Sequence, residues 1–192
     1  MRLPLLAVLL TTIAVPAVAQ TGYAVEKTPD GTVTTTVFSV APQTRLAAAD
    51  YVKLTADALN YQIAADRLAL TKAQRDDVKG YARASLAEAE RQQGALYASL
   101  SNADRKIAKP STRLSSQRQA ALDLLKKAPR SAFDTLYLQQ AAEAAPTLWA
   151  LNKGYATDGS DPALRQVALT SVPTIEQRYT GAKGLLPAAV VD

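Results

Sequence analysis

Apolar residues recur at helical spacing through most of the chain. From Leu46 to Leu70, and again from Val78 to Leu100, they follow one another mostly in steps of three and four residues, with charged residues between them. This is the period of an amphipathic helix. The pattern returns near 116–128, 131–154 and 162–185. The chain is therefore expected to be all-α, an up-down bundle of four long helices and one short one, with short connections and antiparallel neighbours.

The composition agrees with a helical core. Aromatic residues make up 6% of the 192 residues and apolar residues 48%, so alanine and leucine must supply most of the buried surface. Both are good helix formers, whereas a β-sandwich needs more β-branched and aromatic residues. The chain has no cysteine, so no disulfide braces the fold and the core of one domain must suffice.

Local signals predict where the helices begin and where they bend. An oxygen-bearing side chain at the first position, with a Gln or an acid three residues later, satisfies free amides at a helix start. A proline inside a helix removes one backbone hydrogen bond and favours a bend. The expected starts are Thr71–Gln74, Ser116–Gln119, Ser131–Asp134 and Asp161–Pro162, and the expected bends are at Pro146 and Pro173.

The first residues are typical of a secretory signal peptide. Met1 and Arg2 precede a mostly apolar run to Val15, and the small residues up to Ala19 match the pattern that signal peptidase cleaves. The run is too short to span a bilayer, which takes about 20 residues. We expect residues 1–19 to be removed between Ala19 and Gln20. The sequence thus predicts a periplasmic protein, with outer-membrane association possible and no transmembrane segment in the mature chain.

Residues 20–43 form an extension of different character. Two β-branched or aromatic runs, Tyr23–Val25 and Thr32–Phe38, flank the turn-forming Thr28–Gly31, a pattern that predicts a β-hairpin. An isolated hairpin is marginal in water. The alternatives are that it packs on the helices, that it pairs with another chain, or that it is a loosely ordered leader. The helical domain is expected over 44–187, followed by a short tail, 188–192.

Three segments carry a resemblance to a known family. They are Ala48–Leu100, Phe133–Tyr137, and Asp161–Leu164 together with Val172-Pro173. Over Leu46–Leu186 the chain resembles a bacterial family of exported, ferritin-like helical bundles with a domain of unknown function, whose members are often labelled outer membrane proteins. The resemblance implies a ferritin-like four-helix bundle.

The resemblance also implies a metal site that this chain has lost. Family members carry a glutamate, an Asp-His pair and two further histidines; the aligned residues here are Gln62, Glu88 with Ala89, Ala144 and Arg178, and the chain has no histidine at all. Imidazole and thiolate are the usual ligands of transition metals, so no metal or other cofactor is expected. Glu88 and Arg178 could form an ion pair in the vacated space; the alternative is that both point into water.

The remaining residues indicate no reaction. The chain lacks the residues for Ser-His or Cys-His catalysis and has no glycine-rich phosphate loop. We interpret the seven tyrosines from Tyr51 onward and Trp149 as core and bundle edge. The basic residues Arg105, Lys106, Lys109 and Arg113 indicate a solvated connection rather than a nucleic-acid surface.

The sequence therefore predicts a non-enzymatic structural or interaction module of the cell envelope, with an unknown envelope protein or surface as partner and no nucleic acid. The hairpin-like extension is the expected contact element. The alternatives are a ferritin-like metal-binding or redox and stress protein with a degenerate site, and a small-molecule carrier with an apolar pocket between helices.

Overall fold

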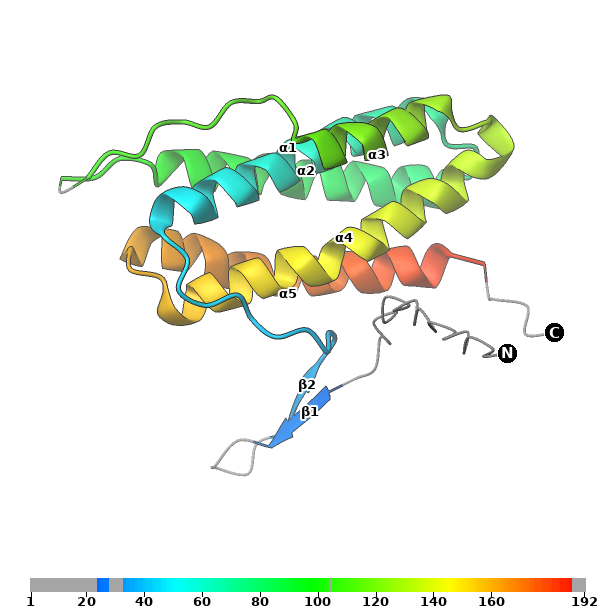
Figure 1. The fold of residues 1–192 in the computed structure, drawn as a ribbon. Coiled ribbons are helices and arrows are strands. Elements are labelled where there is room, and N and C mark those ends of the chain that lie inside the picture. The colour runs from blue at the N-terminus through cyan, green and yellow to red at the C-terminus, as the bar shows by residue number, and fades with distance from the viewer. Residues whose placement is uncertain (1–23, 28–32, 104, 188–192) are drawn as a thin grey trace, which may run out of the picture. The chain divides into compact units, whose positions relative to one another are not determined.

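A computed structural model describes residues 24–27, 33–103 and 105–187 (Figure 1). The chain divides into two compact units, residues 1–39 and 40–192. The expected signal peptide with its cleavage site, the expected hairpin turn and the C-terminal tail from 188 lie outside the described residues.

The first unit contains an antiparallel strand pair. Strand β1, Ala24–Lys27, pairs with β2, Val33–Thr36, in a register that sets Ala24 opposite Thr36 and Lys27 opposite Val33. These strands lie within or beside the two runs that predict a hairpin, so the strand prediction is confirmed.

The second unit is a helical bundle, as the spacing predicts. Its helices are α1 (Ala48–Lys72), α2 (Asp76–Ala98), α3 (Ser116–Lys127), α4 (Arg130–Asp158) and α5 (Pro162–Leu185). Helices α4 and α5 run unbroken through Pro146 and Pro173. In the described part of the chain, no helix is both long and apolar enough to cross a membrane.

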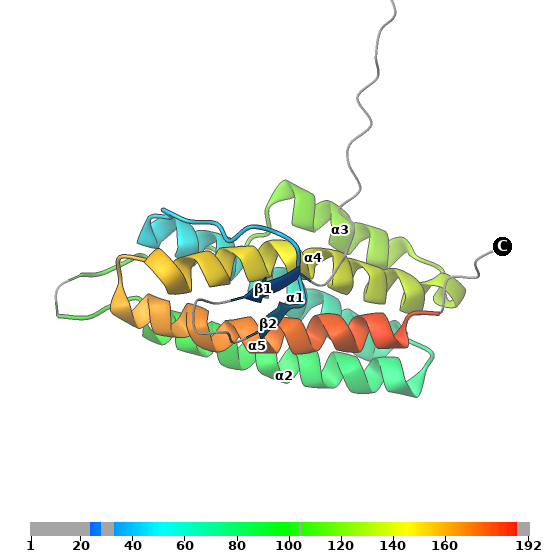
Figure 2. The same cartoon turned by 90° about the horizontal axis from the view of Figure 1, so that it is seen from below.

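The four long helices form a closed ring of neighbours. Helix α1 packs on α2 and α4, and α5 packs on the same two helices, while α3 lies outside against α1 and α4 (Figures 1 and 2). Tight turns join α1 to α2 and α4 to α5. The expectation of short connections throughout was wrong. The connection from the end of α2 to the start of α4, residues 99–129, is long, contains α3 and runs back along the length of the bundle (Figure 1). As a result α2 and α4 point the same way, a connection that ferritin-like bundles also use.

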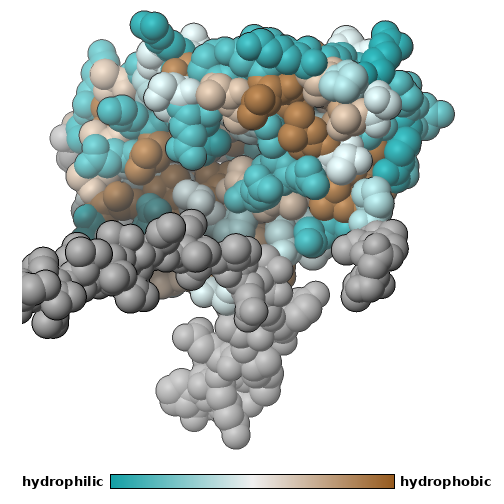
Figure 3. Space-filling view, turned by 45° about the vertical axis from the view of Figure 1, so that its right-hand side comes forward, coloured by the Kyte–Doolittle hydropathy of each residue, from teal (hydrophilic) through white to brown (hydrophobic). Residues whose placement is uncertain are grey.

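Alanine, leucine and tyrosine fill the core. Tyr51 and Tyr155 stack with their ring centroids 4.1 Å apart, and Phe133 stacks on Tyr137. The tyrosines from Tyr51 onward are buried or half-buried, as is Trp149, which confirms their interpretation as core and bundle edge. Figure 3 shows one face, where hydrophilic side chains alternate with hydrophobic patches.

Two of the four predicted helix starts agree with the structure: α3 begins at Ser116, and α5 begins at Pro162 after Asp161. Asp161 caps α5, accepting a hydrogen bond from the Leu164 amide at 2.9 Å. Helices α2 and α4 begin elsewhere than predicted, after Arg75 and Pro129, and none of α2, α3 and α4 has a side-chain cap of its own. The box predicted for α2 fails because Thr71 lies in the last turn of α1, and the box predicted for α4 fails because Ser131 is already the second residue of α4.

Side chains from other helices take over this role. Asp134 of α4 accepts hydrogen bonds from the backbone amides of Gln74 and Arg75, at 3.1 and 2.9 Å, and so fixes the turn before α2. Lys72 of α1 donates to three carbonyls at the end of α3, those of Leu125, Lys126 and Ala128. A positive charge at a helix C-terminus also favours the helix dipole. The helix ends are thus stabilised by tertiary contacts.

The segment before α1 crosses α4 at very short range. The Gln43 amide donates to the Ala150 carbonyl at 2.8 Å. A Cβ atom on Gly154 would lie 2.7 Å from the Gln43 nitrogen and closer still to its carbonyl group. Glycine at 154 is therefore required for this crossing.

Candidate functional site

Three of the five positions that the resemblance marks meet inside the bundle. Gln62 of α1, Ala144 of α4 and Arg178 of α5 line one cavity of about 30 Å³. Such a cavity has room for about one water molecule. The helix packing thus brings these residues together although they are far apart in the sequence.

The centre of this site is a buried carboxylate. Asp66 of α1 is 2% exposed, and its Oδ1 atom accepts a hydrogen bond from the Tyr137 hydroxyl of α4 at 2.6 Å. Its Oδ2 atom has no hydrogen-bond partner among the described residues. The Tyr137 ring stays fixed by stacking on Phe133.

Asp66 is one of the charged residues between the apolar positions of Leu46–Leu70, which the pattern placed away from the core, and for Asp66 that interpretation was wrong. The signal was present: Leu59, Ile63, Asp66 and Leu70 follow one another in steps of four, three and four. This spacing puts the carboxylate on the core-facing stripe.

Polar side chains of the other helices surround Asp66. The Gln62 amide donates to the hydroxyl and to the carbonyl of Ser85 in α2, at 3.1 and 3.2 Å. The Oε1 atom of Gln62 is buried and has no hydrogen-bond partner among the described residues, and the same holds for the Nε and Nη1 atoms of Arg178. The Tyr81 hydroxyl donates to the Arg178 carbonyl at 3.2 Å. The cluster therefore joins all four long helices.

The charge state of the cluster follows from its burial. Loss of hydration raises the pKa of Asp66, while the Tyr137 hydroxyl and the Arg178 guanidinium are among the groups that lower it. Burial, together with the nearby Asp66, raises the pKa of Tyr137 far above its ordinary value. Tyr137 is therefore a permanent donor, and its hydrogen bond favours the ionised form of Asp66.

The predicted ion pair between Glu88 and Arg178 is not formed. Both residues border the same surface depression between α2 and α5. However, Glu88 is held by Arg91 of its own helix, through contacts of 2.6 and 2.8 Å, and by Gln92. The reason is local, because residues three and four apart on a helix meet without ordering a second helix. Ala89 is fully buried and lines neither space.

The cavity residues do not fit the metal that the resemblance implies. Within residues 24–27, 33–103 and 105–187, no three Asp, Glu, His or Cys side chains converge as metal ligands would. The cavity lining supplies one carboxylate, Asp66, and two guanidinium side chains, Arg118 and Arg178. Amide, phenol and guanidinium groups are poor ligands for transition ions. The positive charge of Arg178, which forms no ion pair with a described residue, also repels a cation.

The basic stretch before α3 is only partly a solvated connection. Lys106, Lys109 and Arg113 are exposed. Arg105 instead forms an ion pair with Asp161, the capping residue of α5, with Nε and Oδ2 2.5 Å apart. That contact was missed because the two residues lie 56 positions apart in the sequence.

Comparison of the chain with curated proteins and with solved structures gives no match. Residues 34–185 match a family defined by a domain of unknown function, DUF4142. The matched region contains residues 34–36 of β2 and all five helices, and so includes every residue of the polar cluster. The chain therefore belongs to the DUF4142 family.

Proposed function

We propose that the protein is an exported, periplasmic helical bundle that acts as a structural or interaction module of the cell envelope and catalyses no reaction. One observation carries the proposal: a guanidinium side chain, Arg178, faces the cavity that contains the buried carboxylate, Asp66. Export is supported by the sequence of residues 1–20.

The charges at the cavity support a structural role. A metal ion would need several anionic or imidazole ligands, whereas the lining described above carries one carboxylate and two guanidinium groups. Catalysis on an organic substrate would need more room. Ligand sites typically have volumes of about 300–1,000 Å³, and this cavity has about 30 Å³. The cluster is suited to holding four helices in register.

Metal analysis tests the proposal directly. Protein purified from cells that express the full sequence is expected to contain iron, manganese and zinc far below one ion per chain. Stoichiometric metal, retained after gel filtration, would contradict the proposal and favour the ferritin-like alternative.

A variant that rebuilds ligands tests the charge argument. Gln62→Glu, Ala144→His and Arg178→His together would give the cavity two carboxylates and two imidazoles, and we expect it to retain about one zinc ion per chain. The matched control carries Gln62→Glu and Ala144→His but keeps Arg178, and should retain none. Equal zinc in both variants would show that Arg178 does not exclude a cation.

Fractionation tests export. After expression of the full sequence in a Gram-negative host, the protein is expected in the periplasmic fraction with Gln20 as its first residue. A cytoplasmic protein that keeps Met1 would refute this part of the proposal.

The extension is the proposed contact element. Strands β1 and β2 form a two-stranded sheet, and each strand of such a sheet has an outer edge that can accept another strand. Crosslinking in intact envelopes should recover a partner with the full mature chain, and not with a chain whose mature form begins at Thr44. The same recovery from both would assign the contact to the helices.

A further inference from the structure

A groove much larger than the cavity at Asp66 lies on the outside of the bundle. It has a volume of about 610 Å³ and lies between α1 and the connection that leads to α3. Side chains of both segments give it an apolar wall: Leu54, Ile107, Pro110 and Leu114. Leu54 is 45% exposed and adds its apolar surface to that of its neighbours in the groove. The volume lies in the range typical of small-molecule sites.

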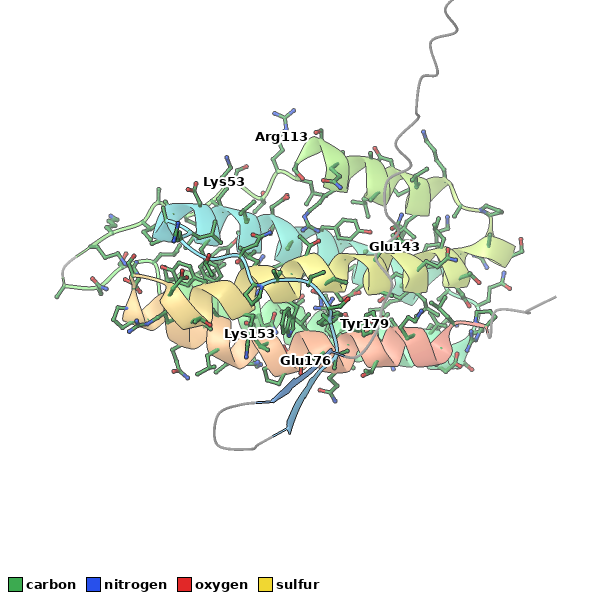
Figure 4. All side chains as sticks on the ribbon, turned by 60° about the horizontal axis from the view of Figure 1, so that its bottom comes forward. Lys53, Arg113, Glu143, Lys153, Glu176 and Tyr179 are labelled. Atoms are coloured by element: carbon green, nitrogen blue, oxygen red, sulfur yellow. The ribbon has the colours of Figure 1, made fainter. Side chains whose placement is uncertain are left out.

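Positive charge surrounds the groove. Lys53 comes from α1, and Lys109 and Arg113 from the connection. Figure 4 shows Lys53 and Arg113 on the same side of the bundle. None of the three forms an ion pair with a described residue. Lys109 is held in place by the ring of Tyr97, with Nζ 4.3 Å from the ring centroid.

The acidic residue of the groove does not balance these cations. Asp57 lines the groove, but its carboxylate accepts a hydrogen bond from the Ser115 amide at 2.9 Å and pairs with Arg118 at 3.1 Å. Its charge is therefore already compensated. The groove combines an apolar wall with three positive charges that pair with no acidic residue in the described part of the chain.

We propose that this groove binds a single-chain anionic amphiphile, an alkyl chain that ends in a carboxylate. The alkyl chain would cover Leu54 and its apolar neighbours, and the carboxylate would lie among Lys53, Lys109 and Arg113. A cation would be repelled, and a small anion without a chain would leave the apolar wall exposed to water. The proposal involves neither the cavity at Asp66 nor the location of the protein, so it can fail independently of the proposed function.

Calorimetric titration with monomeric ligands, below their micellar concentration, tests the proposal. Dodecanoate is expected to bind at least tenfold more tightly than octanoate, because each buried methylene group favours binding. It should also bind at least tenfold more tightly than dodecyltrimethylammonium, which has the same chain and the opposite charge. Equal binding of the two dodecyl compounds, or no binding of dodecanoate, would overturn the proposal.

Substitutions locate the site. The triple variant Lys53→Gln, Lys109→Gln and Arg113→Gln should bind dodecanoate about tenfold more weakly, since each exposed charge contributes modestly. Its matched control, Lys127→Gln, Lys153→Gln and Arg130→Gln, removes the same charges from exposed positions outside the groove and should bind as the unsubstituted protein does. An equal loss in the control would show that net charge alone drives binding.

A filled groove provides a test that keeps every charge. Ala49 lines the groove and is exposed, so Ala49→Trp should fold normally, as circular dichroism can verify, and bind dodecanoate at least tenfold more weakly. Unchanged binding in the folded variant would place the ligand elsewhere. Binding to phosphatidylglycerol vesicles without binding to monomeric dodecanoate would refute the proposal in favour of a membrane surface.

Discussion

Replacement of Tyr137 by phenylalanine tests whether the buried carboxylate depends on its hydroxyl partner. The change removes the 2.6 Å hydrogen bond to Asp66 and keeps the ring that stacks on Phe133. Because the other carboxylate oxygen has no described partner, Asp66 would lose its direct hydrogen bond at Oδ1 with no replacement. Leaving a buried charged acceptor unsatisfied costs about 2 kcal/mol. For a unit of this size that corresponds to a fall in Tm of about 4–8 °C.

The stability that Tyr137→Phe loses should depend on pH in a defined direction. An unfolded aspartate has a pKa of about 3.9, and burial raises the pKa of Asp66 in the folded state. Between these two values the folded protein binds more protons, so its stability falls as pH rises and is flat above the folded pKa. Loss of the Tyr137 hydroxyl raises the pKa of Asp66 further. The deficit of the variant should therefore be smallest below pH 4 and grow toward neutral pH.

Urea unfolding, followed by the fluorescence of Trp149 and by circular dichroism, measures the free energy of unfolding at each pH. Tyr97→Phe is the matched control, because the Tyr97 hydroxyl has no described partner; we expect a change within about 0.5 kcal/mol. A loss in Tyr137→Phe that is no larger than in the control, or that is independent of pH, would refute the reasoning.

Two further predictions concern the contacts between helices. Gly154→Ala should reduce the free energy of unfolding by about 1–2 kcal/mol, because the new methyl group displaces Gln43. Gly94→Ala is the control: its methyl group enters open space, so it should increase the free energy of unfolding by up to about 1 kcal/mol. Denaturant unfolding of both variants checks this prediction, and equal effects would contradict it. Asp134→Ala should lower the free energy of unfolding by about 1–2 kcal/mol, because it removes the hydrogen bonds to the turn before α2. Hydrogen exchange should then be faster at the backbone amides in the first turn of α2. Unchanged exchange at these amides would refute the role of Asp134 as a cap supplied by another helix.

The sequence predicted the helices better than their ends. Helix existence follows from apolar periodicity, which is repeated over many residues and depends on no partner. Helix starts depend on single hydrogen bonds. The Thr71 hydroxyl, for example, donates a hydrogen bond back to the Leu68 carbonyl at 2.8 Å instead of accepting one at the start of a new helix. Asp134, expected to stabilise the start of its own helix, stabilises the turn before α2.

The candidate site, too, was predictable only in part. The resemblance correctly indicated that Gln62, Ala144 and Arg178 belong together, because the family's fold carries its residue pairings with it. It failed for Glu88, where the nearer Arg91 competes for the carboxylate. Asp66 could have been placed in the core from its spacing, but nothing in the sequence identifies Tyr137 as its partner, 71 positions away.

By itself, the sequence determined that this chain forms an all-α bundle without thiol or imidazole ligands, since composition and periodicity are properties of the chain alone. Only the tertiary structure decided that the Asp66 carboxylate is buried against a tyrosine and that three lysine and arginine side chains surround an apolar groove. Both arrangements depend on which segments pack against one another, which the sequence pattern does not specify. Burial then determines how strongly a charged group interacts with its neighbours.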